Sequence, residues 1–186
     1  TLGGSGTVDA SAGNSDLAGA GGGRVAVILV NGTSFGAVAL KAYGGDGGGT
    51  TQEGAAGTVY TRTAANAANA GSILVDNNSL TPSAFTPLPA FAASPEDLTK
   101  TLWSVQNKGK IGLVTNVTIA SLTLSANSYL ELAGCTGTVS SLTMTGKVVH
   151  AGNYTANDLG ALVSDGSPGA QGRLIVRALG TVFMIQ

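Results

Sequence analysis

The chain has 186 residues, of which 29 are glycine, and only 10% are charged, with a net charge of −1. Average soluble domains have about 25% charged residues and about 7% glycine, so this composition is typical of secreted and cell-surface repeat proteins rather than cytosolic enzymes. The few basic residues form no stripe or run, which excludes electrostatic nucleic-acid binding and polybasic lipid binding. A single cysteine excludes an internal disulfide, and no apolar run is long enough to predict a membrane-spanning helix.

Residues 1–65 hold two copies of one loose pattern, which reads strand, glycine turn, strand. The copies are GTVDASAG (Gly6–Gly13) with GGRVAVILV (Gly22–Val30), and GAVALKAYGG (Gly36–Gly45) with AGTVYTRT (Ala56–Thr63). The pattern places Val38 one repeat after Val8, a step of 30, and Val59 one repeat after Val25, a step of 34. Residues alternate with a period of two in the second copy, in Val38–Ala42 and in Thr58–Arg62, which predicts half-buried strands. We expect residues 1–65 to form glycine-cornered turns of a β-helix.

The glycine runs are GAGGG (Gly19–Gly23) and GGDGGG (Gly44–Gly49). Glycine adopts positive φ without steric cost and lets neighbouring backbones approach closely. Because strongly β-prone segments flank both runs, we interpret them as tight corners of stacked strands rather than as flexible linkers.

Residues 66–110 form a connecting region. Ser72–Asp76 is predicted to be a strand, followed by a turn at Asn77 and Asn78. Thr81–Pro95 is rich in proline and predicts an ordered excursion that Phe85 and Phe91 pin to an apolar surface.

A helix is predicted from Pro95 to Ser104, because Ser94 is a good N-cap and proline suits the first helical position. Leu98, Leu102 and Val105 would share one face of this helix. Trp103, the only tryptophan, is expected to pack as part of this cap, with ligand stacking as the alternative.

Residues 111–186 are rich in serine and threonine and contain SLTL at Ser121 and SLTM at Ser141, which corresponds to a step of 20. A step of 20 suits one turn of a β-helix, with Leu142 and Met144 stacked over Leu122 and Leu124. The residues predicted to point inward are Ile119, Leu122, Leu124, Leu130 and Leu132.

The last part of the chain is expected to contain a short helical segment and two strands. The helical segment lies within Ala151–Gly166, with Thr155 or Asn157 as N-cap and Leu159 and Leu162 inward. The strands are Gly172–Arg177 and Thr181–Ile185.

Three motifs resemble the glycine-rich bacterial extracellular β-helix proteins, which include autotransporter-like and surface repeat proteins. The motifs are GGGRVAV followed by GAAGTVYTR, the SLTL and SLTM pair, and AGNYTANDLGAL followed by GRLIV. The resemblance covers most of the chain except Leu80–Gly109. It implies an all-β, single-stranded parallel β-helix (β-solenoid) with a Pro-rich insertion and one or two short helices, in which 1–65, 66–110 and 111–186 form one continuous solenoid. Members of this group are mostly adhesins, matrix components or exported passengers, and they share no catalytic residues.

Residues able to support nucleophilic or metal chemistry are few. His150 is the only histidine, lies in KVVHAG at a strand end, and is interpreted as a surface or turn residue. Cys135 and His150 would supply two ligands where structural zinc takes four, so Cys135 is interpreted as a small buried residue at a corner. Asp46 in GGDGGG is a single copy of a motif that calcium-binding β-rolls repeat, and we interpret it as part of a glycine corner.

Glycoside cleavage needs two carboxylates about 5–10 Å apart. Glu131 is the acidic residue expected in mid-strand, and the position one step of 20 later is occupied by Ala151. Lys108 and Lys110 are the only close basic pair. We therefore assign no catalytic, cofactor-binding or metal-binding residues and predict that the chain is not an enzyme.

Four segments match the N-glycosylation acceptor pattern, starting at Asn31, Asn77, Asn116 and Asn153. In a chain this rich in Asn, Ser and Thr, chance matches are unsurprising, and in a bacterial protein we expect them to be unused.

The sequence favours a structural or adhesive extracellular or cell-surface module, a stiff rod or fibre-forming subunit without a cofactor. The chain begins without Met inside a glycine segment, which we interpret as a piece of a longer polypeptide. Its expected partners are neighbouring copies or neighbouring repeats, stacked end to end as a filament, and glycans or matrix. One alternative is a carbohydrate-binding or carbohydrate-cleaving β-helix. Another is an ice-binding or phage-fibre solenoid, for which Thr123 and Thr143 match at one step.

Overall fold

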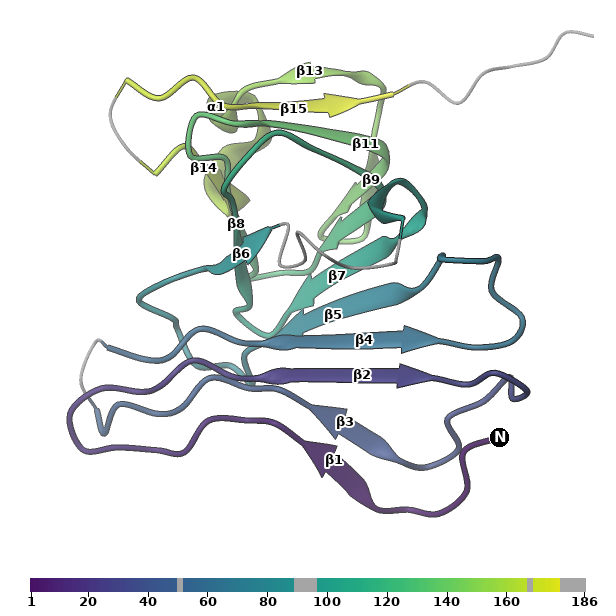
Figure 1. Cartoon of the computed structure of the whole chain (residues 1–186). Coiled ribbons are helices and arrows are strands. Elements are labelled where there is room, and N and C mark those ends of the chain that lie inside the picture. The colour runs from purple at the N-terminus through teal and green to yellow at the C-terminus, as the bar shows by residue number, and fades with distance from the viewer. Residues whose placement is uncertain (50–51, 89–96, 167–168, 178–186) are drawn as a thin grey trace, which may run out of the picture.

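The structure is a computed structural model that describes residues 1–49, 52–88, 97–166 and 169–177. Strands contain 41% of these residues and helical turns 6%, which confirms the predicted all-β class with a few short helices. Figure 1 follows one large sheet from β2 near the bottom of the molecule to β13 at the top.

The described strands are β1 (Thr7–Asp9), β2 (Arg24–Ile28), β3 (Ala39–Lys41), β4 (Thr58–Arg62), β5 (Ser72–Asp76), β6 (Thr86–Leu88), β7 (Leu102–Gln106), β8 (Lys110–Leu113), β9 (Val117–Leu124), β10 (Tyr129–Glu131), β11 (Thr136–Met144), β12 (Lys147–Val149), β13 (Gly152–Tyr154), β14 (Val163–Ser164) and β15 (Arg173–Val176). The helical segments are η1 (Leu98–Lys100), α1 (Ala156–Leu159) and η2 (Gly160–Leu162).

The described strands form three sheets. The large sheet has the order β13-β15-β11-β9-β7-β5-β4-β2, with β12 paired to β11. A four-stranded sheet has the order β14-β10-β8-β6, and a two-stranded sheet pairs β1 with β3. Most neighbouring strands are parallel, whereas β4 with β5, β11 with β12 and β13 with β15 are antiparallel. These antiparallel pairs differ from the purely parallel arrangement expected, because short connections such as 63–71 and 145–146 turn the chain back on itself.

The predicted 20-residue step is confirmed by the register of β9 and β11. Leu142 lies opposite Leu122, and Met144 lies opposite Leu124. The residues predicted to point inward are all buried: Ile119, Leu122, Leu124, Leu130 and Leu132. Like side chains therefore stack on like side chains along this part of the core.

The N-terminal steps are confirmed in one pair of strands and corrected in the other. Val25 lies opposite Val59, as the step of 34 predicts. Val8, however, lies opposite Leu40 and not Val38, so this step is 32. Val38 instead joins a turn, in which its N–H donates to the Phe35 carbonyl. A shift of two positions keeps the same face inward, which is why the alternation predicted the strand but not its register.

The large sheet buries opposite faces in its two halves. Val59 of β4 lies opposite Leu74 of β5. Val59 belongs to a cluster with Val25 and Ala42, and Leu74 and Leu40 of β3 pack against it. The neighbouring pair, Tyr60 and Ile73, belongs to the other cluster. That cluster includes the inward residues of the four-stranded sheet, which are Leu88, Ile111, Leu113, Leu130 and Val163. Because successive strand residues point to opposite faces, the covering layer changes sides at the antiparallel β4–β5 pair.

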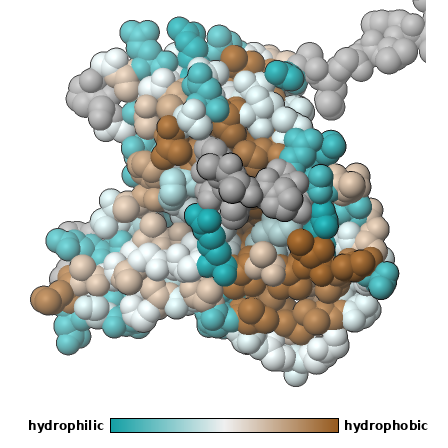
Figure 2. All heavy atoms as spheres, in the orientation of Figure 1, coloured by the Kyte–Doolittle hydropathy of each residue, from teal (hydrophilic) through white to brown (hydrophobic). Residues whose placement is uncertain are grey.

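A hydrophobic area remains visible beside the short β1–β3 sheet. Figure 2 shows it at the lower right of the molecule, next to a mainly neutral and hydrophilic lobe at the lower left. Val27, Leu40 and Leu74 are only partly buried, because three-residue strands cannot cover the five-residue strands behind them.

The glycine runs act mainly through close backbone approach. Gly19–Gly23 have no positive φ, contrary to the corner conformation expected, whereas Gly48 and Gly49 do have positive φ. A Cβ at Gly19 would overlap the Gly45 carbonyl, and a Cβ at Gly57 would overlap the Gly23 carbonyl. The predicted close approach of neighbouring backbones is therefore confirmed.

The glycine-rich segments hydrogen-bond to one another at three-residue intervals. The bonds run from Ala12 N–H to Tyr43 O and Ser15 N–H to Asp46 O, from Gly19 N–H to Gln52 O and Gly22 N–H to Ala55 O, and from Gly57 N–H to Ala42 O and Gly54 N–H to Gly45 O. A three-residue repeat is that of polyproline II chains, whereas a β-ladder repeats every two residues. These segments therefore form a bundle of extended chains, defined here as the glycine bundle (residues 10–23, 42–49 and 52–57).

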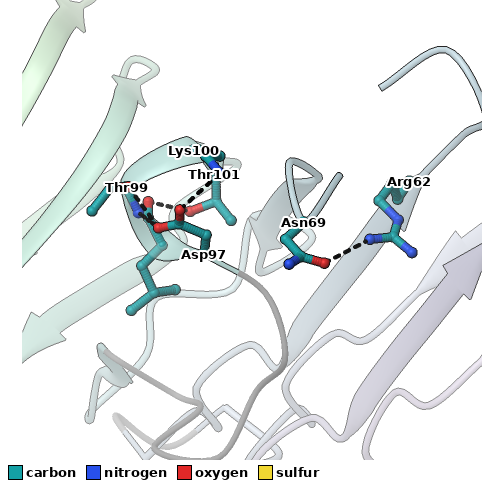
Figure 3. Close-up of polar contacts among 7 residues, drawn as sticks. Arg62, Asn69, Asp97, Thr99, Lys100 and Thr101 are labelled. Carbon is teal, nitrogen blue, oxygen red and sulfur yellow. Dashed lines mark hydrogen bonds and ion pairs between the residues drawn. The ribbon is translucent and has the colours of Figure 1, made fainter. Parts of the chain in front are cut away.

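The prediction of a helix from Pro95 to Ser104 is wrong for most of the residues that the structure describes there. Only Leu98–Lys100 is helical, and it is a 3₁₀ turn capped by Asp97, which accepts from the Thr99 N–H (Figure 3). Leu102 onward is strand β7, which pairs with β5 and β9. Pairing with the parallel strands β5 and β9 on either side outweighs the local residues that favour a helix start. Ser94, Pro95 and Phe91 lie outside the described residues.

Trp103 packs in the main core rather than in a cap, and its side chain is 1% exposed. Its indole N–H donates to Thr101 Oγ1 over 3.0 Å. This burial also excludes the alternative of ligand stacking on Trp103. The sequence predicted a helix at Trp103, and the position of the indole in the core depends instead on its place in strand β7.

The other local predictions are mostly confirmed. The strand Ser72–Asp76 is β5, and Thr155 caps α1 in a reciprocal hydrogen-bonding pair with Asp158. Leu159 and Leu162 pack against the core as expected. The segment Thr181–Ile185 lies outside the described residues.

Part of the Pro-rich excursion is a strand. β6 pairs with β8 and includes Pro87, which an edge strand tolerates. Phe85 is half-buried, and its ring lies directly against Gly112, as the expected pinning requires.

Replacing Gly57 with alanine tests the close packing of the glycine bundle. We expect Gly57→Ala to lower the free energy of unfolding by about 1–3 kcal/mol, because the new methyl group overlaps the Gly23 carbonyl. Urea unfolding followed by circular dichroism and by Trp103 fluorescence measures this. Gly6→Ala is the matched control, since nothing lies within 4 Å of its Cβ position. Equal stability of the two variants would contradict the packing described.

Candidate functional site

A polar groove runs along the outer side of β1 and β3 and of the glycine segments that follow them. It is defined here by Asp9, Asn14, Lys41, Tyr43, Asp46 and Asn78, and its volume is about 330 Å³. Asp9 lies opposite Lys41 in the β1–β3 register. Because Val8 and Leu40 occupy the alternate positions and Leu40 packs on the core, Asp9 and Lys41 face outward.

Hydrogen bonds across the 32-residue step hold the groove in shape. Tyr43 N–H donates to Ser11 Oγ over 2.9 Å, and Asp46 N–H donates to Asn14 Oδ1 over 3.0 Å. Ser11 N–H in turn donates to Asp9 Oδ1 over 2.8 Å. These bonds fix the side chains of Ser11, Asn14 and Asp9 to backbone positions.

Electrostatics set the protonation states in the groove. Hydrogen bonds from Ser11, chiefly from its hydroxyl, lower the pKa of the Asp9 carboxyl. Burial raises the pKa of the Tyr43 phenol, and the charges of Asp76 and Asp9 raise it further. At neutral pH the groove therefore presents an ionised Asp9 and a protonated Tyr43.

Asn77 joins the groove to the rest of the fold. Its side chain is fully buried, and its Oδ1 accepts from Gly44 N–H over 3.0 Å. Its Nδ2 donates to the carbonyls of Gly54 and Leu80. One side chain therefore connects the β5 turn to two segments of the glycine bundle.

The sequence predicts only a turn and a glycosylation pattern at Asn77, because no local pattern indicates its buried contacts with Gly44 and Gly54. The burial of Asn77 excludes its modification in the folded chain. Asn31, Asn116 and Asn153 are exposed, and Asn116 Oδ1 accepts from the Thr136 N–H across a 20-residue step.

His150 and Cys135 lie apart from the groove. His150 is exposed directly after β12, as predicted, and its carbonyl accepts from the Tyr154 hydroxyl. Cys135 is half-buried rather than buried, and its Sγ lies 4.0 Å from the Leu113 carbonyl. It follows the turn at Ala133 and Gly134, where a side chain remains partly open to solvent.

Glu131 ends strand β10 and forms an ion pair of 2.8 Å with Lys110. Its neighbour on the next strand is Ser164 and not Ala151, because the β12 and β13 strands and α1 intervene in the chain. Lys110 Nζ also lies 5.9 Å from the centre of the Phe85 ring. Lys108 instead donates to Thr81 Oγ1, so the two lysines point to different partners.

A second hollow lies between α1 and the β14–β15 connection and is lined in part by Asn157, Asp165 and Arg173. Asp165 Oδ1 accepts from Gly172 N–H over 2.9 Å and lies 3.4 Å from Gly134 N. This carboxylate therefore holds the connecting backbone together.

Serine and threonine residues of β9 lie opposite like residues of β11: Ser121 opposite Ser141, Thr118 opposite Thr138 and Thr123 opposite Thr143. The next residue beyond Thr138 is Ile175, and the residue beyond Thr143 is Val148. The ladder on which the ice-binding alternative depends therefore extends no further than β11 on this side.

Metal and membrane features are limited in the part of the chain that the structure describes. There, no three His, Cys, Asp or Glu side chains lie together in a way that could hold a metal ion. No described helix is long and apolar enough to cross a membrane.

Comparison with known proteins finds no matching family model, no curated protein with significant similarity and no solved structure that matches significantly.

Replacing Asn77 tests its role as a buried connector. We expect Asn77→Ala to lower the free energy of unfolding by about 2–4 kcal/mol, because it leaves the Gly44 N–H and the Gly54 carbonyl without their partner. Chemical denaturation measures the loss. Asn157→Ala is the control, because Asn157 is exposed on α1. A loss no larger than that of the control would show that water replaces the side chain at no cost.

Proposed function

We propose that this chain is a structural and adhesive module of a bacterial extracellular surface protein, built as a β-solenoid. The observation that carries the proposal is the in-register pairing of parallel strands that lie one turn of chain apart. Ser141 lies opposite Ser121, a step of 20, and Val59 lies opposite Val25, a step of 34. In a solenoid each turn buries its apolar face only against its neighbours, so the repeat specifies a stack rather than a pocket.

The buried side chains support a stiff body. Val105, Leu124 and Met144 stack along consecutive neighbouring strands, and all three are buried. At the other end, backbone carbonyls fill the space between glycines, which leaves little room for movement. A rigid, charge-poor body suits a spacer or presenting surface outside the cell, and the proposed role is non-catalytic.

Duplicating one turn tests the solenoid. We expect a variant with a second copy of residues 117–136 inserted after Thr136 to fold with unchanged or higher thermal stability, because the copy provides strands of matching register. Differential scanning calorimetry and circular dichroism measure the unfolding transition and the strand content.

The matched control inserts a second copy of residues 117–126 at the same place. Half a turn cannot complete the 20-residue step, so the strands that follow would lose their partners, and we expect a lower melting temperature or aggregation. If both insertions were tolerated equally, the inserted residues would be a loop and the solenoid proposal would fail.

The proposed partners are neighbouring copies or neighbouring repeats of the parent protein, and the open edge of β2 supports this. Within the described residues β2 ends the large sheet and pairs with β4 alone. Ile28 and Val30 near this edge are 44% and 78% exposed. An unprotected apolar edge strand is a template for pairing with a further strand.

We expect the chain to self-associate through β2 as its concentration rises, and Ile28→Lys to shift this association to at least about tenfold higher concentration, since lysine protects edge strands. Sedimentation velocity over a concentration series measures the shift. Val148→Lys on β12 is the control, because Val148 is exposed away from this edge. A chain that stays monomeric at the highest concentration would rule out the filament version of the proposal.

A further inference from the structure

We propose that the polar groove beside β1 and β3 binds a neutral oligosaccharide and is the adhesive site of the module. This inference depends on the adhesive part of the proposed function and not on the solenoid. In this groove an aromatic ring, carboxylates and amides line one hollow.

The groove presents both hydrogen-bond donors and acceptors. The carboxylates of Asp9 and Asp46 each accept from a backbone N–H through Oδ1, which fixes their direction and leaves further acceptor capacity on each group. The Lys41 ammonium and the Asn78 amide add donors along the same hollow. Sugar hydroxyl groups donate and accept at once, so they match a surface that offers both in fixed positions.

Tyr43 supplies an apolar face between two hollows. It lines the polar groove on one side, and on the other it borders a smaller cleft of about 90 Å³ with Leu40, Val59 and Leu74. A pyranose ring has polar edges and an apolar C–H face, so a ring stacked on Tyr43 would direct its hydroxyl groups toward the groove.

Charge selects the class of sugar. The groove contains Asp9 and Asp46 against Lys41, and Asp76 lies close enough to raise the pKa of Tyr43. This excess of negative charge disfavours uronates, sulfated sugars and sialic acids, so the ligand is neutral. A volume of about 330 Å³ is at the lower end of the ~300–1,000 Å³ range of small-molecule sites, which suits a short segment of a longer chain.

The test is binding of the full chain to neutral hexasaccharides of glucose, mannose, xylose and N-acetylglucosamine, with oligogalacturonate as the anionic comparison. Isothermal titration calorimetry and saturation-transfer NMR measure binding. We expect at least one neutral hexasaccharide to bind, with Tyr43→Ala weakening it at least about tenfold and Tyr43→Phe much less. Asp9→Asn, which removes an exposed charge, should also weaken it.

Tyr129→Ala is the matched control, because Tyr129 is a half-buried tyrosine on β10, in a different sheet. Circular dichroism of each variant separates lost binding from lost fold. Absence of binding to every neutral hexasaccharide, tighter binding of oligogalacturonate, or unchanged binding by folded Tyr43→Ala and Asp9→Asn would overturn the groove proposal. Each of these results would leave the solenoid proposal intact, since tolerance of the duplicated turn tests that separately.

Discussion

Pairing of strands in register, with like side chains on neighbouring strands, is the constraint on which the rest of this structure depends. Leu122 and Leu142 lie side by side on β9 and β11, and both are buried. A slip of one residue would turn the leucines outward and the serines and threonines inward. The 20-residue step between β9 and β11 is therefore the register that keeps these leucines buried.

In the N-terminal half, neighbouring segments are also held in register, but backbone atoms rather than side chains pack between them. Where the leucines of the C-terminal half fill space between sheets, Gly19, Gly45 and Gly57 allow backbone atoms to do so. Hydrogen bonds every three residues replace the ladder of a sheet. Because glycine loses the most conformational entropy on folding, this packing needs many hydrogen bonds between segments, and Asn77 adds three more at the junction with β5.

The antiparallel β4–β5 pair links these two ways of building a core. It lets one continuous sheet bury Val59 and Leu74 on one face, and Tyr60 and Ile73 on the other. The short β1–β3 sheet consequently lies on the opposite face from the four-stranded sheet. The polar groove exists because of this change of side, since it forms where the outer face of β3 meets the turn after β5.

The sequence by itself determined the all-β class, the 20-residue step, the inward residues and the short capped helix near Thr155, because these follow from composition, local periodicity and capping chemistry. Only the tertiary structure decided that β4 and β5 run antiparallel, that Trp103 lies on a core strand, and that Val8 pairs with Leu40. The groove was likewise beyond sequence reasoning, because Asp9, Tyr43 and Asn78 share no local pattern. They meet because strands far apart in the sequence pair in register, and that choice depends on contacts which no single segment contains.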